Sequence, residues 1–107
     1  NRDVIMVNAE VCYAGAIERV LATHPQVAAA YVVGTPDPDT GEAIHAFVVP
    51  AGDEPPDRGQ LKALVRARLS ANSVPSTVTA IRDVPINAGG KPDKHALRVR
   101  TGTPHEA

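Results

Sequence analysis

Apolar residues recur along the chain at two spacings, one typical of helices and the other typical of strands. The helical spacing of three and four residues occurs twice, in Ile17, Val20 and Leu21 and in Leu61, Leu64, Val65 and Leu69. These stripes predict helices over residues 14–23 and 58–71. The first is expected to end at His24, because the residue before Pro25 is pushed out of the helical region. Asp57 is a suitable N-cap for the second.

Short runs rich in valine, isoleucine and alanine predict the strands. They cover residues 4–7, 11–13, 27–33, 44–49 and 77–84. The first two flank residues 8–10 and predict a small β-hairpin, since the asparagine there tolerates turn geometry. Residues 34–41 are dense in glycine, proline, threonine and aspartate, which predicts a surface loop. A flexible loop is expected over 85–90, followed by a last short helix over 93–99.

The order of the predicted elements fixes the expected fold class. The strand over 44–49 is apolar at nearly every position, which indicates a sheet covered on both faces. We therefore expect an α+β fold, with a small mixed three-stranded sheet flanked by helices and preceded by a short β-hairpin. One domain is expected over residues 1–100 and a flexible tail over 101–107. The chain starts without methionine and runs almost at once into an apolar stretch, which predicts that it was cut from a longer protein.

Composition removes several classes of function. The formal net charge is −1, and the only aromatic residues are Tyr13, Tyr31 and Phe47, so a nucleic-acid surface is not expected. No apolar run approaches the roughly 20 residues of a membrane span, and no signal peptide precedes the first strand. The lone Cys12 excludes an intrachain disulfide and points to a reducing compartment. We expect a cytoplasmic protein.

No metal site is expected either. The four histidines lack ligand-like spacing, and a single cysteine cannot build a two-cysteine zinc site. Asp37, Asp39 and Glu42 are acidic loop residues, but the prolines among them do not fit a calcium loop. His45 lies on a buried strand and is expected to be a hydrogen-bonded core residue, and Cys12 a small packed apolar one.

The first candidate functional residue lies near the end of the chain, in the segment Gly89-Gly90-Lys91. Two glycines give a backbone that can approach a ligand closely, and the lysine adds a cation suited to phosphate or carboxylate oxygens. The segment is not a P-loop, since Pro85 and Pro92 stand where glycine and a hydroxyl residue are required. From spacing alone, an ordinary solvated turn remains the more frequent case.

Ordered matches over nearly the whole chain resemble one family. The strongest covers residues 84–98, with a proline, a short loop, Gly-Lys and a basic residue before Ala-Leu. Further matches lie at 17–21, 24–27, 33–37, 41–42 and 46–49. Together, from Arg2 to about Arg98, they resemble the C-terminal domain of adenylate-forming enzymes: acyl-CoA synthetases, peptide-synthetase adenylation domains and firefly luciferase. The sequence Gly-Lys-Pro-Asp-Lys is most similar to the corresponding motif of bacterial fatty-acyl or aryl-acyl-CoA ligases.

The resemblance implies an AMP-forming acid–thiol ligase that works in two half-reactions. A carboxylic acid and ATP give an acyl-adenylate, and the thiol of CoA then displaces AMP. A large N-terminal domain would hold ATP, Mg²⁺ and the acid, while this domain alone would bind no cofactor and be inactive. It would act as a lid that rotates between the half-reactions.

By the same match, Lys91 is the lysine of the adenylation step, placed by Gly89 and Gly90, and Arg2 is the hinge. Lys91 would also be a target for a lysine acetyltransferase. Lys94, three residues on, is expected to be a solvated charge.

Asn8, Ala9 and Glu10 would line the tunnel for the pantetheine thiol of CoA. From the residues alone they are an ordinary hairpin turn. The chain departs from the family at several of these positions: Arg2 replaces the usual lysine or aspartate, and Ala9 the usual glycine. Val11 and Ala16 are also atypical. These departures keep an alternative open, a stand-alone, non-catalytic binding module with the same fold. The acid, the oligomeric state and the choice between CoA and a carrier-protein thiol stay undetermined.

Overall fold

The computed structural model describes residues 3–102, which form five strands and three helices. In chain order these are β1 (Val4–Val7), β2 (Glu10–Tyr13), α1 (Ala14–Ala22), β3 (Val27–Asp37), β4 (Gly41–Pro50), α2 (Arg58–Arg68), β5 (Thr77–Ala80) and α3 (Lys94–Gly102). Every predicted helix and strand is present, with shifted ends. The hinge prediction, Arg2, and residues 103–107 of the predicted tail lie outside the described residues.

The strands form one mixed sheet in the order β2-β1-β4-β3, with β5 also paired to β4. β3 and β4 run antiparallel from the Val27–Pro50 pair to the Asp37–Gly41 pair. β5 runs parallel to β4, and β1 meets the start of β4 only at Val7. The α+β class and the mixed sheet are confirmed. The hairpin also joins this sheet, which raises its strands from the expected three to five.

The prediction of a loop over 34–41 is wrong for most of its length. β3 continues to Asp37 and β4 begins at Gly41, so the turn is confined to residues 38–40. Asp37 organises this turn, because its Oδ2 accepts hydrogen bonds from the backbone N–H groups of Asp39 and Thr40 and from the Thr40 hydroxyl. The turn-forming residues thus close one long hairpin, with Pro36 still in register opposite Glu42.

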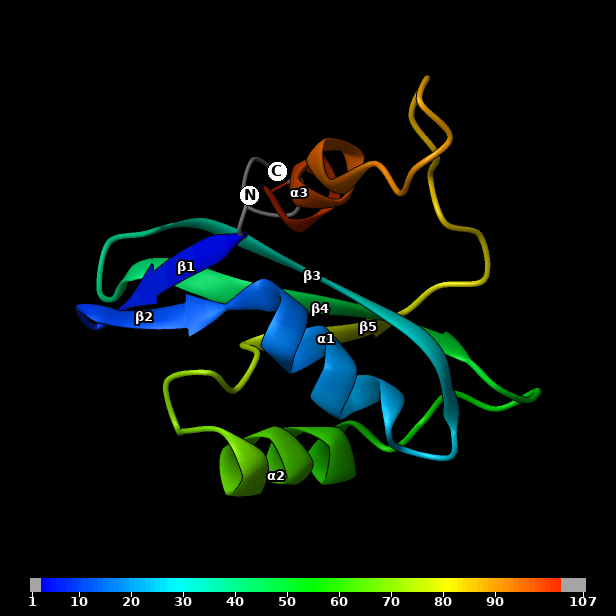
Figure 1. Cartoon of the computed structure of the whole chain (residues 1–107), viewed down its shortest axis with the longest axis horizontal. Helices are drawn as coiled ribbons and strands as arrows, with labels where there is room; N and C mark the ends of the chain where they lie inside the picture. The colour runs from blue at the N-terminus through cyan, green and yellow to red at the C-terminus, as the bar shows by residue number, and fades with distance from the viewer. Residues whose placement is uncertain (1–2, 103–107) are drawn as a thin grey trace.

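Helices cover both faces of the sheet, as the apolar strand predicted (Figure 1). α1 and α2 pack on one face through fully buried Ile17, Leu21, Leu61 and Val65. α3 lies on the other face, where Leu97 joins a smaller cluster of Val33, Phe47 and Ile81. One stripe prediction is wrong: Leu69 follows the end of α2 and is 40% exposed, because the helix stops at Arg68.

Two core predictions are confirmed. His45 is 8% exposed, with Nε2 3.0 Å from the Thr35 hydroxyl and Nδ1 2.8 Å from the Thr77 hydroxyl. Cys12 is buried in the main cluster.

The predicted N-cap of α2 is also confirmed, because the Asp57 side chain accepts a hydrogen bond from the Gln60 N–H. None of the helices in residues 3–102 has the length and apolar character needed to cross a membrane.

Candidate functional site

Lys91 lies on a loop that projects from the body of the molecule, between β5 and α3 (Figure 1). Residues 86–92 are all exposed, so no core packing holds them in place. The loop is nevertheless closed by hydrogen bonds. Asn87 N–H donates to the Lys91 carbonyl over 2.8 Å, and Ile86 forms a bridge with Pro92. The expected flexible loop is therefore a small, ordered hairpin.

Both glycines next to Lys91 have identifiable roles in this loop. Gly90 has φ +82°, a left-handed conformation that favours glycine, and its N–H donates to the Asn87 carbonyl over 3.0 Å. Gly89 N–H donates to the Asn87 side chain over 2.8 Å. The Lys91 side chain extends from this frame into solvent, and within residues 3–102 its ammonium has no hydrogen-bond or ion-pair partner.

Lys94 is not the solvated charge that the sequence predicted. Its Nζ lies 2.8 Å from Asp3 Oδ2 and 2.8 Å from Glu18 Oε2, and its side chain is only 26% exposed. Glu18 also accepts from the Val32 N–H. Burial acts to lower the pKa of Lys94, but the hydrogen bonds and charges of the two carboxylates outweigh it and raise that pKa above its ordinary value. Both partners are far away in sequence, so local pattern did not reveal them.

The hairpin turn between β1 and β2 has a backbone conformation that its residues, none of them glycine, rarely adopt. Val7 and Glu10 pair across it, and Asn8 and Ala9 have φ of +52° and +66°. Positive φ at both central residues is the pattern of a type I′ turn, in which glycine usually takes one position. Asn8, Ala9 and Glu10 are all exposed, as a lining of a ligand channel requires.

Asn72 ties this turn to the loop after α2. Its Oδ1 accepts from Asn8 Nδ2 over 2.9 Å, and its Nδ2 donates to Glu10 Oε1 over 2.8 Å. Asn72 and Asn87 were not among the site residues predicted from the sequence. Asn87 had a usable signal, since asparagine shortly before two glycines is typical of a side-chain-closed turn. Asn72 had none, because its partners come from the other end of the chain.

The structure does not bring Lys91 together with the hairpin turn. The two lie at well-separated parts of the molecule, one on the loop before α3 and the other at the far end of the sheet (Figure 1). If both act on one substrate, the domain must therefore present them in turn.

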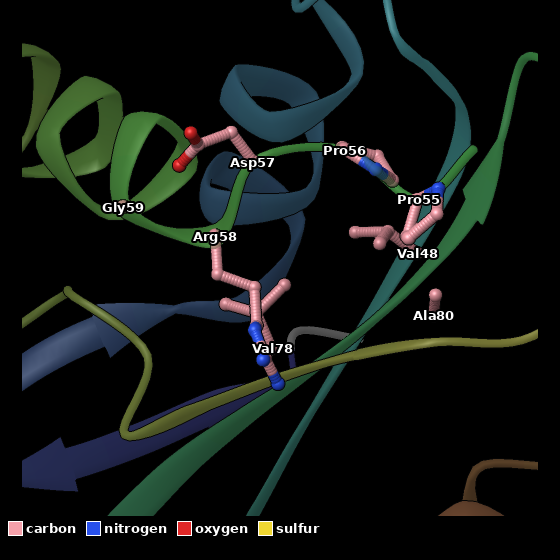
Figure 2. A pocket seen from close by; sticks show the side chains of 8 residues that line it. All are labelled: Val48, Pro55, Pro56, Asp57, Arg58, Gly59, Val78 and Ala80. Atoms are coloured by element: carbon pink, nitrogen blue, oxygen red, sulfur yellow. The ribbon is translucent and has the colours of Figure 1, made fainter.

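Clefts lie at several places on the described part of the domain, and one of them is lined in part by Glu10 of the hairpin turn. One cleft of about 570 Å³ is lined by Val48, Pro55, Pro56, Asp57, Arg58, Gly59, Val78 and Ala80 (Figure 2). Arg58 extends across it toward Val78, while Asp57 turns toward the helix that it caps. Among the described residues, no three histidine, cysteine, aspartate or glutamate side chains cluster as a metal site would need.

Comparison with known proteins gives a consistent picture. The family model of the AMP-binding enzyme C-terminal domain matches residues 16–91. A fatty acid–[acyl-carrier-protein] ligase of Streptomyces coeruleorubidus is 40% identical over 99 residues, which is 92% of this chain and 19% of that protein. A medium/long-chain-fatty-acid–CoA ligase of Mycobacterium tuberculosis is 36% identical over 106 residues, again 92% of this chain and 19% of that protein.

Solved structures agree. The amide bond synthetase McbA of Marinactinospora thermotolerans superposes with a TM-score of 0.89 at 46% identity, over 92% of this chain and 20% of that chain. An acyl-CoA synthetase of Brucella canis superposes with a TM-score of 0.85 at 30% identity, over 98% of this chain and 20% of that one. This chain therefore spans about a fifth of the length of the proteins it matches. With its fold, its ordered motifs and these matches in agreement, the chain belongs to the family of AMP-binding enzyme C-terminal domains.

Proposed function

We propose that this chain is the rotating C-terminal lid of an AMP-forming acid–thiol ligase, in which a larger N-terminal domain binds ATP, Mg²⁺ and a carboxylic acid. The observation that carries this proposal is Lys91: an ammonium without a partner in the described residues, presented to solvent by an ordered loop. A cation held out in this way fits a reaction that takes place on another domain. Membership of the family of AMP-binding enzyme C-terminal domains supports adenylate formation as that reaction.

In the first half-reaction, a carboxylate oxygen attacks the α-phosphorus of ATP and pyrophosphate leaves. Negative charge builds between the attacking carboxylate and the α-phosphate in the transition state. Lys91 placed there stabilises the transition state more than the ground state, which is how a fixed charge accelerates a reaction. Its length and exposure let it reach into a neighbouring active site without moving the core of its own domain.

In the second half-reaction, a thiolate attacks the acyl carbon of the adenylate and AMP leaves. We assign the exposed turn of Asn8, Ala9 and Glu10 to the channel for this thiol, with Arg2 as the pivot that brings it into place. The outer face of the same hairpin carries exposed Val4, Met6, Val11 and Tyr13, with exposed fractions of 39 to 46%. An apolar patch of this kind is expected to pack on another surface, here the adenylating domain in the second pose.

The thiol acceptor differs between relatives. The Streptomyces protein is named for an acyl-carrier-protein and the Mycobacterium protein for CoA. A fatty or aryl acid with CoA is the substrate pair that we propose for this chain. The location that we propose is cytoplasmic, where ATP and CoA are available.

A second candidate function replaces the thiol by an amine. McbA, at 46% identity, is an amide bond synthetase. The methyl group of Ala9, in a turn where glycine is usual, narrows any channel that the turn lines. In this alternative an amine attacks the acyl-adenylate and forms an amide as AMP leaves. Offering the longer enzyme CoA and an amine in competition distinguishes the two, because only one product should accumulate.

Exposure of Lys91 also suits regulation. A lysine acetyltransferase partner would find the ammonium accessible, and acetylation would remove its charge. The modified protein should lose adenylation to the same extent as Lys91→Ala and should keep the second half-reaction.

The experiment that tests the lid assignment is a domain exchange. This chain replaces the matching C-terminal domain of McbA, and ATP–pyrophosphate exchange is measured with the acid substrate of McbA. We expect exchange well above that of the N-terminal domain alone, and its loss when the exchanged domain carries Lys91→Ala. A folded chimera with no more exchange than the N-terminal domain alone would contradict the assignment.

A further inference from the structure

The Lys91 loop must hold its shape without the help of a core. Residues 86–92 are exposed, whereas a catalytic group has to be held within a fraction of an ångström of its working position. Close backbone turns can do this through their own hydrogen bonds. The question is which side chain in the loop supplies them.

The geometry singles out Asn87. Its Oδ1 accepts the N–H of Gly89 over 2.8 Å and the N–H of Lys91 over 3.1 Å. Its own backbone N–H donates to the Lys91 carbonyl, and its carbonyl accepts from Gly90. Both backbone polar groups of Lys91 are therefore bound to this one residue, so the Cα–Cβ direction of Lys91 follows the position of Asn87.

Neighbouring residues close the base of the loop. Asp93 N–H donates to the Pro85 carbonyl over 2.7 Å, and Asp93 Oδ1 accepts from the Ala96 N–H at the start of α3. Asp93 thus holds the base of the loop, while the hydrogen bonds of Asn87 determine the conformation of its tip.

We infer that Asn87 is the positioning residue for Lys91: its side-chain oxygen fixes the backbone from which the lysine reaches the reacting groups. This inference rests on the proposed function of Lys91 and adds a specific residue to it. Asn87 provides an acceptor without a charge. An aspartate in its place would keep the acceptor and add a carboxylate close to the ammonium that the reaction needs.

The first readout needs no activity. In the 107-residue chain, NMR magnetisation transfer from water measures the exchange rates of the Gly89 and Lys91 amide protons. Asn87→Ala removes both acceptor contacts and should speed their exchange by about 10- to 100-fold. Asn87→Asp should keep both rates near those of the parent. Asn72→Ala is the matched control, since it removes another side-chain amide with two hydrogen bonds and should leave the loop unchanged.

The second readout is adenylation by the longer enzyme. Asn87→Ala should lower kcat of the first half-reaction by about tenfold and change KM for ATP and acid little, because Lys91 is misplaced while the substrates bind to the other domain. The second half-reaction on supplied acyl-adenylate should be unchanged. Asn87→Asp, which restores the loop, should recover more adenylation than Asn87→Ala does.

The possible results distinguish a failure of the positioning role of Asn87 from a failure of the proposed function of Lys91. Unchanged amide exchange in Asn87→Ala, or faster exchange with normal adenylation, overturns the role of Asn87 while a defective Lys91→Ala keeps the proposed function intact. Normal adenylation by Lys91→Ala overturns the proposed function itself. A general loss of stability would appear as a lower melting temperature and as equal losses in both half-reactions, and this result too would contradict a positioning role.

Discussion

Ala9 holds a backbone conformation that alanine rarely adopts, with φ +66° in an exposed turn. A left-handed conformation costs a residue with a Cβ roughly 1–2 kcal/mol. Ala9→Gly removes this cost but gives the unfolded chain more freedom, which offsets about 0.4–1 kcal/mol. We expect a net stabilisation of about 0.5–1 kcal/mol, measured as a higher urea midpoint. Ala9→Val should shift the midpoint the opposite way.

The same substitution tests the assignment of the turn. In the longer enzyme, Ala9→Gly should leave adenylate formation unchanged and hold or raise the rate of thioester formation, because it removes a methyl group from the wall of the proposed channel. A fall in the rate of adenylation would contradict the assignment of this turn to the second half-reaction.

Asp37 makes the β3–β4 turn sensitive to acid. Hydrogen bonds from Thr40, first from its backbone and then from its hydroxyl, hold the pKa of the Asp37 carboxyl below its ordinary value. A carboxylate with a lowered pKa in the folded state stabilises the protein above its unfolded pKa of about 4, and this stabilisation is lost as pH falls through the folded pKa. Urea titrations from pH 6 downward should show a weaker acid dependence in Asp37→Asn. An identical dependence in both proteins would contradict this role.

At the scale of elements, Lys94 joins the start of α3 to α1 and to the residue before β1 through Glu18 and Asp3. Lys94→Met leaves two half-buried carboxylates next to each other without their cation. Since the cluster is partly exposed, we expect a loss of about 1–2 kcal/mol rather than the larger cost of a fully buried pair. Urea unfolding measures the loss, and Arg66→Ala on the exposed face of α2 is the control, with little change expected.

The pKa of Lys94 adds an alkaline signature. A raised folded-state pKa means that the stabilisation is complete below the unfolded pKa of about 10.4 and is lost as pH rises through the folded value. The parent should therefore lose stability above pH 10 more steeply than Lys94→Met. Parallel curves for the two proteins would show that the ion cluster does not contribute.

Local pattern predicted the elements well and their partners poorly. Ile17 and Leu61 revealed their helices because burial repeats with the helical period, and Asp57 revealed its cap because the contact is local. The loop prediction at 34–41 failed because turn-forming residues can also extend a hairpin once Asp37 closes it tightly. The prediction that Lys94 is a solvated charge failed because its ion-pair partner Asp3 lies 91 residues away in the sequence, which leaves no local signal. The role proposed for Lys91 rests on family resemblance, because a Gly-Gly-Lys segment alone is common in ordinary turns.

At the scale of the whole molecule, the two core clusters cover both faces of the sheet, which favours independent folding. The candidate groups, in contrast, lie on separate exposed segments, Lys91 on the loop before α3 and Asn8, Ala9 and Glu10 at the β1–β2 turn (Figure 1). We predict that the 107-residue chain unfolds cooperatively in urea and shows no ATP–pyrophosphate exchange with any acid. Exchange by the purified chain would contradict its role as a lid for another domain.

The proposed lid function requires Lys91 to act in one half-reaction and to be absent from the other. The decisive measurement is the rate of each half-reaction, taken separately, for Lys91→Ala in the longer enzyme, with Arg66→Ala as the control of equal charge change. We predict a loss of about 100- to 1,000-fold in adenylate formation. With the same variant, the thiol of CoA should attack a supplied acyl-adenylate at the parent rate. The variant should also unfold at the parent urea midpoint, because the Lys91 side chain is exposed. Equal losses in both half-reactions, or normal adenylation, would contradict the account.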